Sequence, residues 1–284
     1  MEKILVPTDF TPIAETGLRL AVEIARRSGA VVSLMNFTRH PFGSTFSATG
    51  DISKKQDGED TRFTLELLKV NQAKLEDLAA AYRSDGVEIE YGIIDDELKD
   101  GIDNYLNKEM IDLVVMGTSG EATVEEAFTG NHTEQVIEVS SCPVLSVRDG
   151  FRIEDFSRMV LAVNEIKEDQ ILIGLNTLRQ LAECFDAHID LLHVVKGGEV
   201  RTDLETYFTR MAETAALQNY TVTIIEASEP AEAVIQFARD HQAGVVAVIK
   251  NSKDGIFRIF SNHFSNRLVK EVGRPVFTFN LQNA

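Results

Sequence analysis

Short apolar runs alternate along the first half of the chain with longer stretches in which apolar residues recur at helical spacing. A short apolar run bounded by turn residues predicts a buried strand, and a period of about 3.6 residues predicts a helix packed on it. Residues 87–94 begin by alternating apolar and charged side chains, as in a strand with one exposed face. We therefore predict strands at 3–8, 30–37, 87–94, 111–116 and 143–148, and helices at about 61–84, 96–109 and 131–140.

The segment between the first two strands contains signals for both ends of a helix. Thr11 stands where an N-cap hydroxyl is expected, and Pro12 follows at the first helical position. Gly29 stands where a helix commonly ends in a left-handed residue. Between these signals, the apolar side chains at helical spacing are Leu18, Ala21, Val22 and Ala25.

The same order of segments occurs twice in the chain. Counterparts keep their order and rough spacing: Lys3–Asp9 corresponds to Arg158–Asn164, Val32–Phe37 to Ile189–Val194, and Cys142–Val147 to Arg274–Phe279. Such repetition predicts two copies of one domain. We place the copies at residues 1–149 and 157–284, with the seam near Asp149–Ser157. In the second copy we expect strands and helices at 158–163, 167–184, 187–195, 199–218, 220–226, 230–242, 244–250, 262–272 and 275–280.

Regular alternation of strands and helices is typical of the α/β class. We predict two tandem, doubly wound, mostly parallel five-stranded sheets with helices on both faces. Such sheets bind ligands beyond the carboxyl ends of their strands, where the strand order reverses. The loops that follow residues 8, 37 and 116 are therefore expected to meet at one ligand site.

Composition and charge narrow the classes of function. The chain has 284 residues, 44% of them hydrophobic and 26% charged, as in a globular protein. Its net charge of -17 argues against binding to nucleic acids or to an anionic membrane surface. Pro7 and Asp9 interrupt the first apolar run too early for a signal peptide, and no run approaches the roughly 20 residues of a membrane span. Cys142 and Cys184 lack metal spacing, so we expect them to be packing residues in a reduced, cytoplasmic protein.

A glycine-bearing loop carries the candidate chemistry. Gly117 and Gly120 follow the apolar strand at 111–116, and Gly130 and Asn131 open the next helix. Glycines let a backbone pass close to a ligand, and a helix amino terminus favours an anion such as phosphate. The same residues also have ordinary structural roles, since glycines occur in any loop and asparagine is a good N-cap.

This spacing of glycines resembles the nucleotide motif of the ATP-binding universal stress proteins, in which Ser or Thr follows the last glycine. The opening Ile4–Phe10 and the closing Cys142–Val147 are similar to that family's first and last strands. The resemblance covers residues 1–148 and, less sharply, 157–281, as in tandem two-domain members. It implies an adenine nucleotide alpha hydrolase-like fold and a site for ATP, or for ADP or AMP, in the first copy. The implied cofactor-binding residues are Pro7, Asp9, Phe37, Gly117, Gly120, Gly130 and Asn131. Of these, Asp9 would lie near the adenosine part, and the backbone of Phe37 would read adenine.

Two departures from the family pattern affect the expected affinity. Asn131 replaces the usual hydroxyl residue. The loop between the glycines holds Glu121, Glu125 and Glu126 and no Lys or Arg. If these carboxylates face solvent, they change little. If they face the ligand, we expect weak binding, a need for Mg²⁺, or a less charged nucleotide.

In the second copy the motif is degraded. Asn164 replaces the aspartate, and we expect Lys250 and Lys253 to replace the first two glycines, ahead of Ser261 and Asn262. A long side chain at a close-approach position should block the phosphate seat. Lys250, Lys253 and Arg258 would then bind another anion or simply be solvated. We therefore read this copy as a structural or regulatory partner of the first.

No catalytic or metal-ligating constellation is present in the sequence. His188 and His193 lie an odd number of positions apart on one predicted strand, so they face opposite sides. The leading hypothesis is a nucleotide-binding stress-response regulator. The alternatives are a slow ATPase or adenylate-handling enzyme, and a scaffold that has lost its ligand. The resemblance also implies dimerisation through the last strand, so we expect an internal pseudo-dimer that pairs 143–147 antiparallel with 275–279. A homodimer of whole chains is left open.

Overall fold

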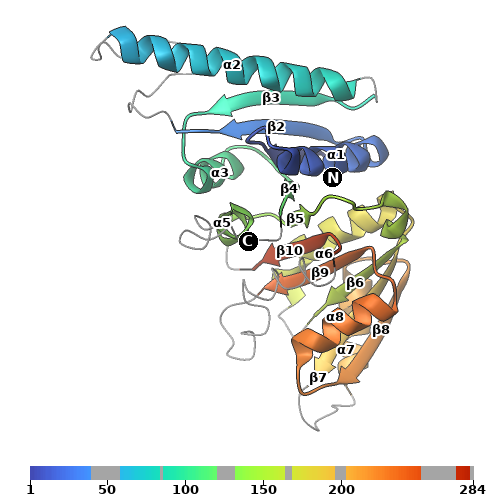
Figure 1. Cartoon of the computed structure of the whole chain (residues 1–284). Helices are drawn as coiled ribbons and strands as arrows, with labels where there is room; N and C mark the ends of the chain where they lie inside the picture. Colours follow the sequence, from blue (N-terminus) through green and yellow to red (C-terminus); the bar gives the residue numbers. More distant parts are fainter. Residues whose placement is uncertain are drawn as a thin grey trace.

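A computed structural model describes residues 1–39, 58–83, 86–119, 132–163, 168–195, 203–250 and 273–281. Within these ranges the strands form one ten-stranded sheet (Figure 1). The strands of its first half are β1 (Lys3–Pro7), β2 (Val31–Phe37), β3 (Ile89–Ile94), β4 (Leu113–Gly117) and β5 (Val144–Val147). Those of its second half are β6 (Arg158–Ala162), β7 (His188–Val195), β8 (Tyr220–Glu226), β9 (Val245–Lys250) and β10 (Val276–Asn280).

The two halves of the sheet are internally parallel and meet at one antiparallel junction. The strand order is β3-β2-β1-β4-β5-β10-β9-β6-β7-β8. Every pairing within a half is parallel, whereas β5 and β10 run antiparallel, with Phe277 opposite Leu145. The doubly wound α/β fold is therefore confirmed, and the pairing of these two strands is the one that the sequence predicts. The two expected five-stranded sheets are halves of a single sheet.

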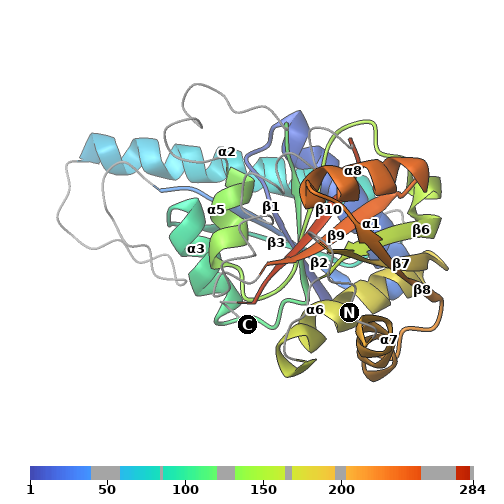
Figure 2. The ribbon, with the colours of Figure 1, turned by 90° about the horizontal axis from the view of Figure 1, so that it is seen from below.

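Helices cover both faces of the sheet (Figures 1 and 2). In the first half, α1 (Pro12–Ser28) and α2 (Gly58–Arg83) pack on one face, and α3 (Leu98–Leu106) and α5 (His132–Val139) pack on the other. In the second half, α6 (Glu168–Cys184) and α7 (Leu204–Thr214) continue the face of α1, while α8 (Pro230–Asp240) lies on the opposite face.

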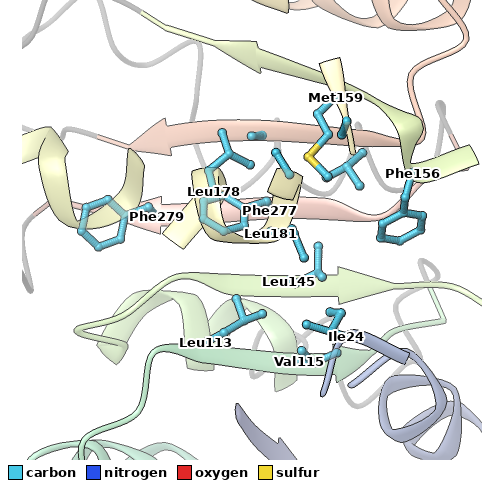
Figure 3. Packing of buried hydrophobic residues seen from close by; sticks show 14 of the residues in the cluster. Ile24, Leu113, Val115, Leu145, Phe156, Met159, Leu178, Leu181, Phe277 and Phe279 are labelled. Atoms are coloured by element: carbon cyan, nitrogen blue, oxygen red, sulfur yellow. The ribbon is translucent and has the colours of Figure 1, made fainter. Parts of the chain in front are cut away.

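The hydrophobic core on the α1 face runs through the junction without a break. Figure 3 shows Leu145 of β5 and Phe277 of β10 between Ile24 of α1 and Leu178 of α6. All four side chains are inaccessible to solvent. Full burial of a side chain of this size contributes about 1.5–3 kcal/mol. The junction is therefore a core of the molecule rather than a surface contact between two separate bodies.

The seam between the halves is also packed. A short 3-10 helix (Ile153–Ser157) leads into β6 and buries Phe156 against Phe185, which directly follows α6, with ring centroids 4.9 Å apart. The carboxylate of Asp155 forms an ion pair with Arg274. A Cβ atom on Gly244 would overlap the backbone of Asp155, so only glycine fits there. The segment is thus anchored by contacts with three separate turns of the second half.

Helix α1 begins and ends where the sequence predicts. The Thr11 hydroxyl accepts a hydrogen bond from the N–H of Ala14 at 3.2 Å, and Pro12 opens the helix. Gly29 has φ +75° and donates its N–H to the carbonyl of Ala25. Both ends are therefore stabilised by local caps.

Two helices of the second half end earlier than the pattern predicts. Helix α7 was expected at 199–218 but ends at Thr214, and α8 was expected to reach residue 242 but ends at Asp240. After each, a non-glycine residue adopts a left-handed conformation, Ala216 at φ +55° and Gln242 at φ +52°. No glycine marks these turns, so the sequence gives no stop signal. The helix expected at 262–272 lies outside the described residues.

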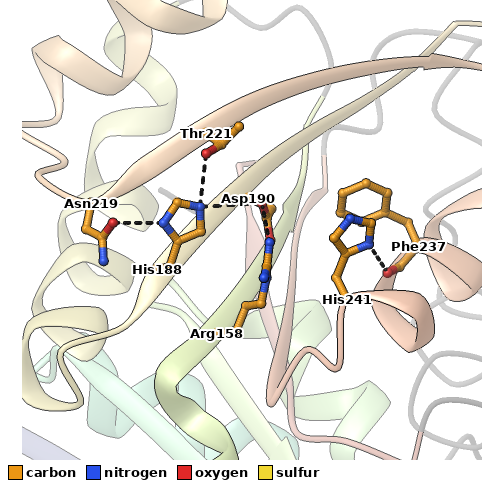
Figure 4. A network of polar contacts seen from close by, with 7 residues as sticks. All are labelled: Arg158, His188, Asp190, Asn219, Thr221, Phe237 and His241. Carbon is orange, nitrogen blue, oxygen red and sulfur yellow. Dashed lines mark hydrogen bonds and ion pairs between the residues drawn. The ribbon is translucent and has the colours of Figure 1, made fainter.

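A polar network lies at the amino ends of β6 and β7 (Figure 4). Arg158 donates to both carboxylate oxygens of Asp190, at 2.7 and 3.2 Å, and Asp190 is almost fully buried. His188 contacts Asn219 and Thr221 at 2.8 and 3.1 Å. This network lies at the edge opposite the carboxyl ends of these strands, so we assign it a structural role.

Among the described helices, none is long and apolar enough to cross a bilayer.

Candidate nucleotide site

The carboxyl ends of β1, β2 and β4 surround a cavity of about 270 Å³. Four of the seven predicted site residues line it: Pro7, Asp9, Phe37 and Gly117. The other three, Gly120, Gly130 and Asn131, lie outside the described residues. The remaining lining residues are Thr8, Thr11, Ile13, Ala14, Leu98, Met116, Thr118, Ser119, His132 and Thr133.

Asp9 closes the turn between β1 and α1. Its Oδ1 accepts hydrogen bonds from the N–H of Thr11 at 3.0 Å and from the Thr11 hydroxyl at 2.6 Å. Thr11 in turn caps α1, so the carboxylate stabilises the start of the helix as well as lining the cavity. The turn role is an Asx-type arrangement, which needs only an acceptor at this atom.

The residue after Asp9 stores backbone strain in the same turn. Phe10 has φ +67°, a left-handed conformation that costs a non-glycine residue about 1–2 kcal/mol. Its N–H donates to the Thr8 hydroxyl at 3.1 Å, and the ammonium group of Lys74 lies 5.0 Å from its ring centroid. A second tether comes from Asn36, whose Nδ2 donates to the carbonyl of Thr8 at 2.7 Å. These contacts offset the strain and hold the cavity wall in one shape.

Phe37 ends β2 with its ring packed on α3. The ring meets Tyr105 edge-on, with centroids 6.3 Å apart, and lies against the backbone of Gly101. The carbonyl of Met35 accepts from the N–H of Thr8. Successive peptide groups of a strand point to alternate sides, so the N–H and C=O of Phe37 point the same way, beyond the end of β1.

Gly117 is required by packing within the protein. A Cβ atom at this position would overlap the carbonyl group of Ile13 at the start of α1. The sequence predicts the close approach of a ligand at Gly117, whereas the group that comes close in the structure is a helix of the same chain. Gly117 is not among the glycines with positive φ, so backbone conformation does not explain it.

The described wall of the cavity carries no Lys or Arg side chain. Asp9 contributes a carboxylate, and His132 stands exposed at the first position of α5. Thr133 follows it, almost fully buried, and places a hydroxyl residue beside the predicted phosphate position. Sequence reasoning passed over Leu98, His132 and Thr133. The weak signal for them was their place at the start of helices that follow the ligand-edge loops.

The second half seats its first helix differently. In the sheet, Gly117 pairs with Val147, and the counterpart of Val147, Phe279, pairs with Ile249. The prediction that Lys250 replaces Gly117 was therefore wrong by one residue, since Ile249 holds that place. A Cβ on Gly174 of α6 would overlap the ring of Phe279, which fills this region. Asn164, Lys253, Arg258, Ser261 and Asn262 lie outside the described residues, and Lys250 is described only in its backbone.

One contact is nevertheless common to both halves. In the second half His193 takes the place of Asn36, and its Nδ1 lies 2.9 Å from the carbonyl of Val163. In both halves, therefore, a side chain of the second strand contacts the backbone carbonyl that follows the first strand, but the residue type differs. His188 and His193 sit at opposite ends of β7 with separate partners. In the described part of the chain, no group of three or more His, Cys, Asp or Glu residues is arranged to hold a metal ion.

Comparison with known proteins agrees with this architecture. The model of the universal stress protein family matches residues 1–148. Universal stress protein MJ0531 of Methanocaldococcus jannaschii is 26% identical over 153 residues, covering 52% of this chain and 82% of that protein. Universal stress protein YxiE of Bacillus subtilis is 27% identical over 146 residues, covering 51% and 98%.

Similarity to solved structures extends over both halves. A universal stress protein from Archaeoglobus fulgidus covers 98% of this chain and 96% of its own, with a TM-score of 0.68 and 15% identity. The cytoplasmic domain of a prokaryotic cation chloride cotransporter covers 100% and 97%, with a TM-score of 0.59 and 10% identity. At these identities the likeness concerns the fold alone. With the family match over residues 1–148, the sequence and the fold lead to one assignment: the chain belongs to the universal stress protein family.

Proposed function

We propose that this protein is a stress-response regulator that binds an adenine nucleotide in the cavity between Asp9, Phe37 and Gly117. The observation that carries the proposal is that these residues, chosen from the sequence, line one cavity at the carboxyl edge of the sheet. Apolar groups at one end suit a base, and the backbone of Phe37 offers an edge to it. The hydroxyl and N–H groups at the β4 loop and the start of α5 suit ribose and phosphate.

A charge introduced into the cavity wall tests this proposal. Ile13 lines the cavity and is 44% exposed, near the amino terminus of α1, where a carboxylate also favours the helix. Ile13→Glu should therefore leave stability unchanged but weaken ATP binding by about tenfold or more through repulsion of the phosphates. The matched control is Ile173→Glu, because Ile173 is 50% exposed on α6, away from this cavity. Equal affinities of the two variants for ATP, measured by calorimetry, would show that the nucleotide does not bind in this cavity.

The bound nucleotide is ATP, ADP or AMP, with Mg²⁺ compensating part of the phosphate charge. The cavity wall supplies few positive groups, so the adenosine part should provide most of the affinity and Mg²⁺ should strengthen ATP binding. Titrations of the three nucleotides with and without Mg²⁺ separate these contributions. Equal affinity for ATP in the presence of Mg²⁺ and of EDTA would contradict the role given to the cation.

We further propose that nucleotide binding serves regulation rather than turnover. The Thr11 hydroxyl that contacts Asp9 in the cavity wall also caps α1, and His132 has no hydrogen-bond partner in the described part of the chain that would orient it as a base. Mass spectrometry of gently purified protein tests the alternatives. Bound ATP supports the regulator, ADP or AMP together with phosphate release supports a slow ATPase, and absence of any nucleotide supports a scaffold.

The second half, in this proposal, is the pseudo-dimer partner of the first, with units at residues 1–149 and 157–284 in a cytoplasmic protein. The antiparallel pairing of β5 with β10 supports this, since each strand would otherwise leave an open sheet edge. One chain also replaces a bimolecular association by an intramolecular one. Residues 1–150 expressed alone should self-associate, and Leu145→Pro should make the fragment monomeric. A fragment that is monomeric without the substitution would contradict the proposal. Light scattering of the whole chain would show separately whether two chains form a homodimer.

A further inference from the structure

A second cavity of about 480 Å³ adjoins the first along the carboxyl edge of the sheet. The two cavities share Ile13, Thr118 and Ser119 as lining residues, so they are contiguous around the start of α1. The first volume lies just below the usual range of ligand pockets, about 300–1,000 Å³, and the two together fall within it. The other residues that line the second cavity are Pro12, Glu15, Thr16, Arg19, Arg148 and Asp149.

Of the four charged side chains that line this second cavity, three have partners among the described residues and one does not. Arg19 contacts Asp149 at 2.7 Å and the Thr16 hydroxyl at 3.0 Å, and this pair lowers the pKa of Asp149. Glu15 accepts a hydrogen bond from the Tyr82 hydroxyl at 3.3 Å. Arg148 is half-buried and has neither an ion pair nor a hydrogen bond with any residue that the structure describes. A partly buried guanidinium without a counterion favours an incoming anion.

The sheet places Arg148 one strand away from the first cavity. Gly117 pairs with Val147, and the N–H of Thr118 donates to the carbonyl of Val147 at 2.8 Å. Thr118 and Arg148 therefore leave neighbouring strands side by side. The amino terminus of α1, at Pro12 and Ile13, faces both cavities and adds a partial positive charge.

We propose that Arg148 binds the distal phosphates of the nucleotide whose adenosine part occupies the first cavity. This inference rests on the proposed function, which it extends from an adenine nucleotide to the length of its phosphate chain. The phosphates pass Ile13 and Ser119 into the second cavity, where the planar guanidinium matches phosphate oxygens in a bidentate manner. The attraction is electrostatic, so the preference for phosphate falls with rising salt, although Glu15 in the same cavity offsets part of the attraction at any salt concentration. Arg148 thereby makes the site selective for ATP and ADP over adenosine.

The substitution Arg148→Gln tests the inference, because glutamine keeps hydrogen-bond donors and loses the charge. Adenosine, AMP, ADP and ATP are titrated against the full chain at one ionic strength. We expect ATP affinity to fall by about tenfold or more, as for a lost charged hydrogen bond, and adenosine affinity to change by less than about twofold. Arg152→Gln is the matched control, since Arg152 is exposed nearby and pairs with Glu154. Its affinities should match those of the unaltered protein.

The outcomes separate this inference from the proposed function. Loss of adenosine and ATP affinity in equal measure, or no loss of either, would overturn the role of Arg148 and leave the nucleotide site standing. Failure of the unaltered protein to bind any of the four ligands would refute both. Arg148→Lys retains the charge and should recover part of the ATP affinity. The ³¹P resonance of the terminal phosphate of bound ATP should shift in Arg148→Gln and stay in place in Arg152→Gln.

Discussion

A Cβ atom on Gly17 would lie 2.6 Å from the backbone nitrogen of Gly117. The two glycines therefore let α1 rest directly on the end of β4, backbone against backbone. This contact sets the distance between the Asp9 turn and the loop that starts at Thr118, which are opposite walls of the candidate site. It also means that a side chain at Gly117 would move the helix, so a substitution there tests the fold together with the ligand.

Gly17→Ala should lower the free energy of unfolding by about 1–3 kcal/mol, the usual cost of an added methyl group in a packed interior. Alanine alone would favour the helix by about 1 kcal/mol, so the sign reports the contact with Gly117. Nucleotide affinity should fall as well, because α1 forms a wall of the cavity. Gly174→Ala, which meets the ring of Phe279, should destabilise the protein without changing affinity. A stabilised Gly17→Ala variant in urea denaturation would refute this account.

Asn36→Ala should remove the tether of the Thr8 carbonyl and leave that acceptor unsatisfied in a buried site, at a cost of about 1–3 kcal/mol. It also removes the acceptor of Asn71, whose Nδ2 lies 3.3 Å from Asn36 Oδ1. We expect the Asp9 turn to loosen and nucleotide affinity to fall severalfold. Hydrogen exchange of the turn amides checks the mechanism. Unchanged protection from Thr8 to Thr11 would argue against it.

Because the thiol of Cys142 is buried, the free energy of unfolding should fall as the pH rises through the alkaline range. Burial raises its pKa from 9.0 to about 11, so above pH 9 the unfolded chain loses this proton while the folded protein keeps it. The contribution of the protonated thiol to the free energy of unfolding is complete below pH 9 and is lost as the pH rises through 11. Between pH 8.5 and pH 10.5, the unaltered protein should lose about 1–2 kcal/mol more than Cys142→Ala in urea denaturation. Parallel losses in the two proteins would contradict the shift.

Arg158→Ala should cost more than Lys3→Ala, although the two cations hold corresponding positions in the two halves. Arg158 is 40% exposed and leaves Asp190, only 3% exposed, without its partner, so we expect a loss of about 2 kcal/mol. Lys3 pairs with Glu90 and Glu109, each 43% exposed, and its loss should cost about 0–1 kcal/mol. Asp190→Asn should recover part of the loss in the Arg158→Ala background. Equal costs for the two alanine variants would show that burial of Asp190 does not matter.

Most of the fold could be predicted from the sequence because buried parallel strands read as apolar runs and the caps of α1 are local. The ends of α7 and α8 could not, because Ala216 and Gln242 carry no signal for a left-handed turn. The position of Ile249 opposite Phe279 depends on strand register, which the repeat alone left one residue uncertain.

The candidate site was predicted in part for a similar reason. Pro7, Asp9, Phe37 and Gly117 come from strand ends, which parallel sheets bring together. Leu98 and Thr133 reach the first cavity because their helices pack on the sheet, and Arg148 lines the second because its strand pairs with β4. Only the folded chain brings these residues to the cavities. The reason for glycine at position 117 was likewise hidden, because Ile13 is its neighbour only in space.

Helix α5 is a rigid rod whose two ends touch different halves of the molecule. Its first residue, His132, faces the candidate site, and Asn280 of β10 donates to the carbonyls of Ile137 and Glu138 near its other end. Eight residues of helix span about 12 Å. A displacement of one end by a ligand therefore reaches β10 without passing through the sheet. In the proposed function, α5 would carry occupancy of the cavity to the second half, although the antiparallel junction points the carboxyl edges of the two halves in opposite directions.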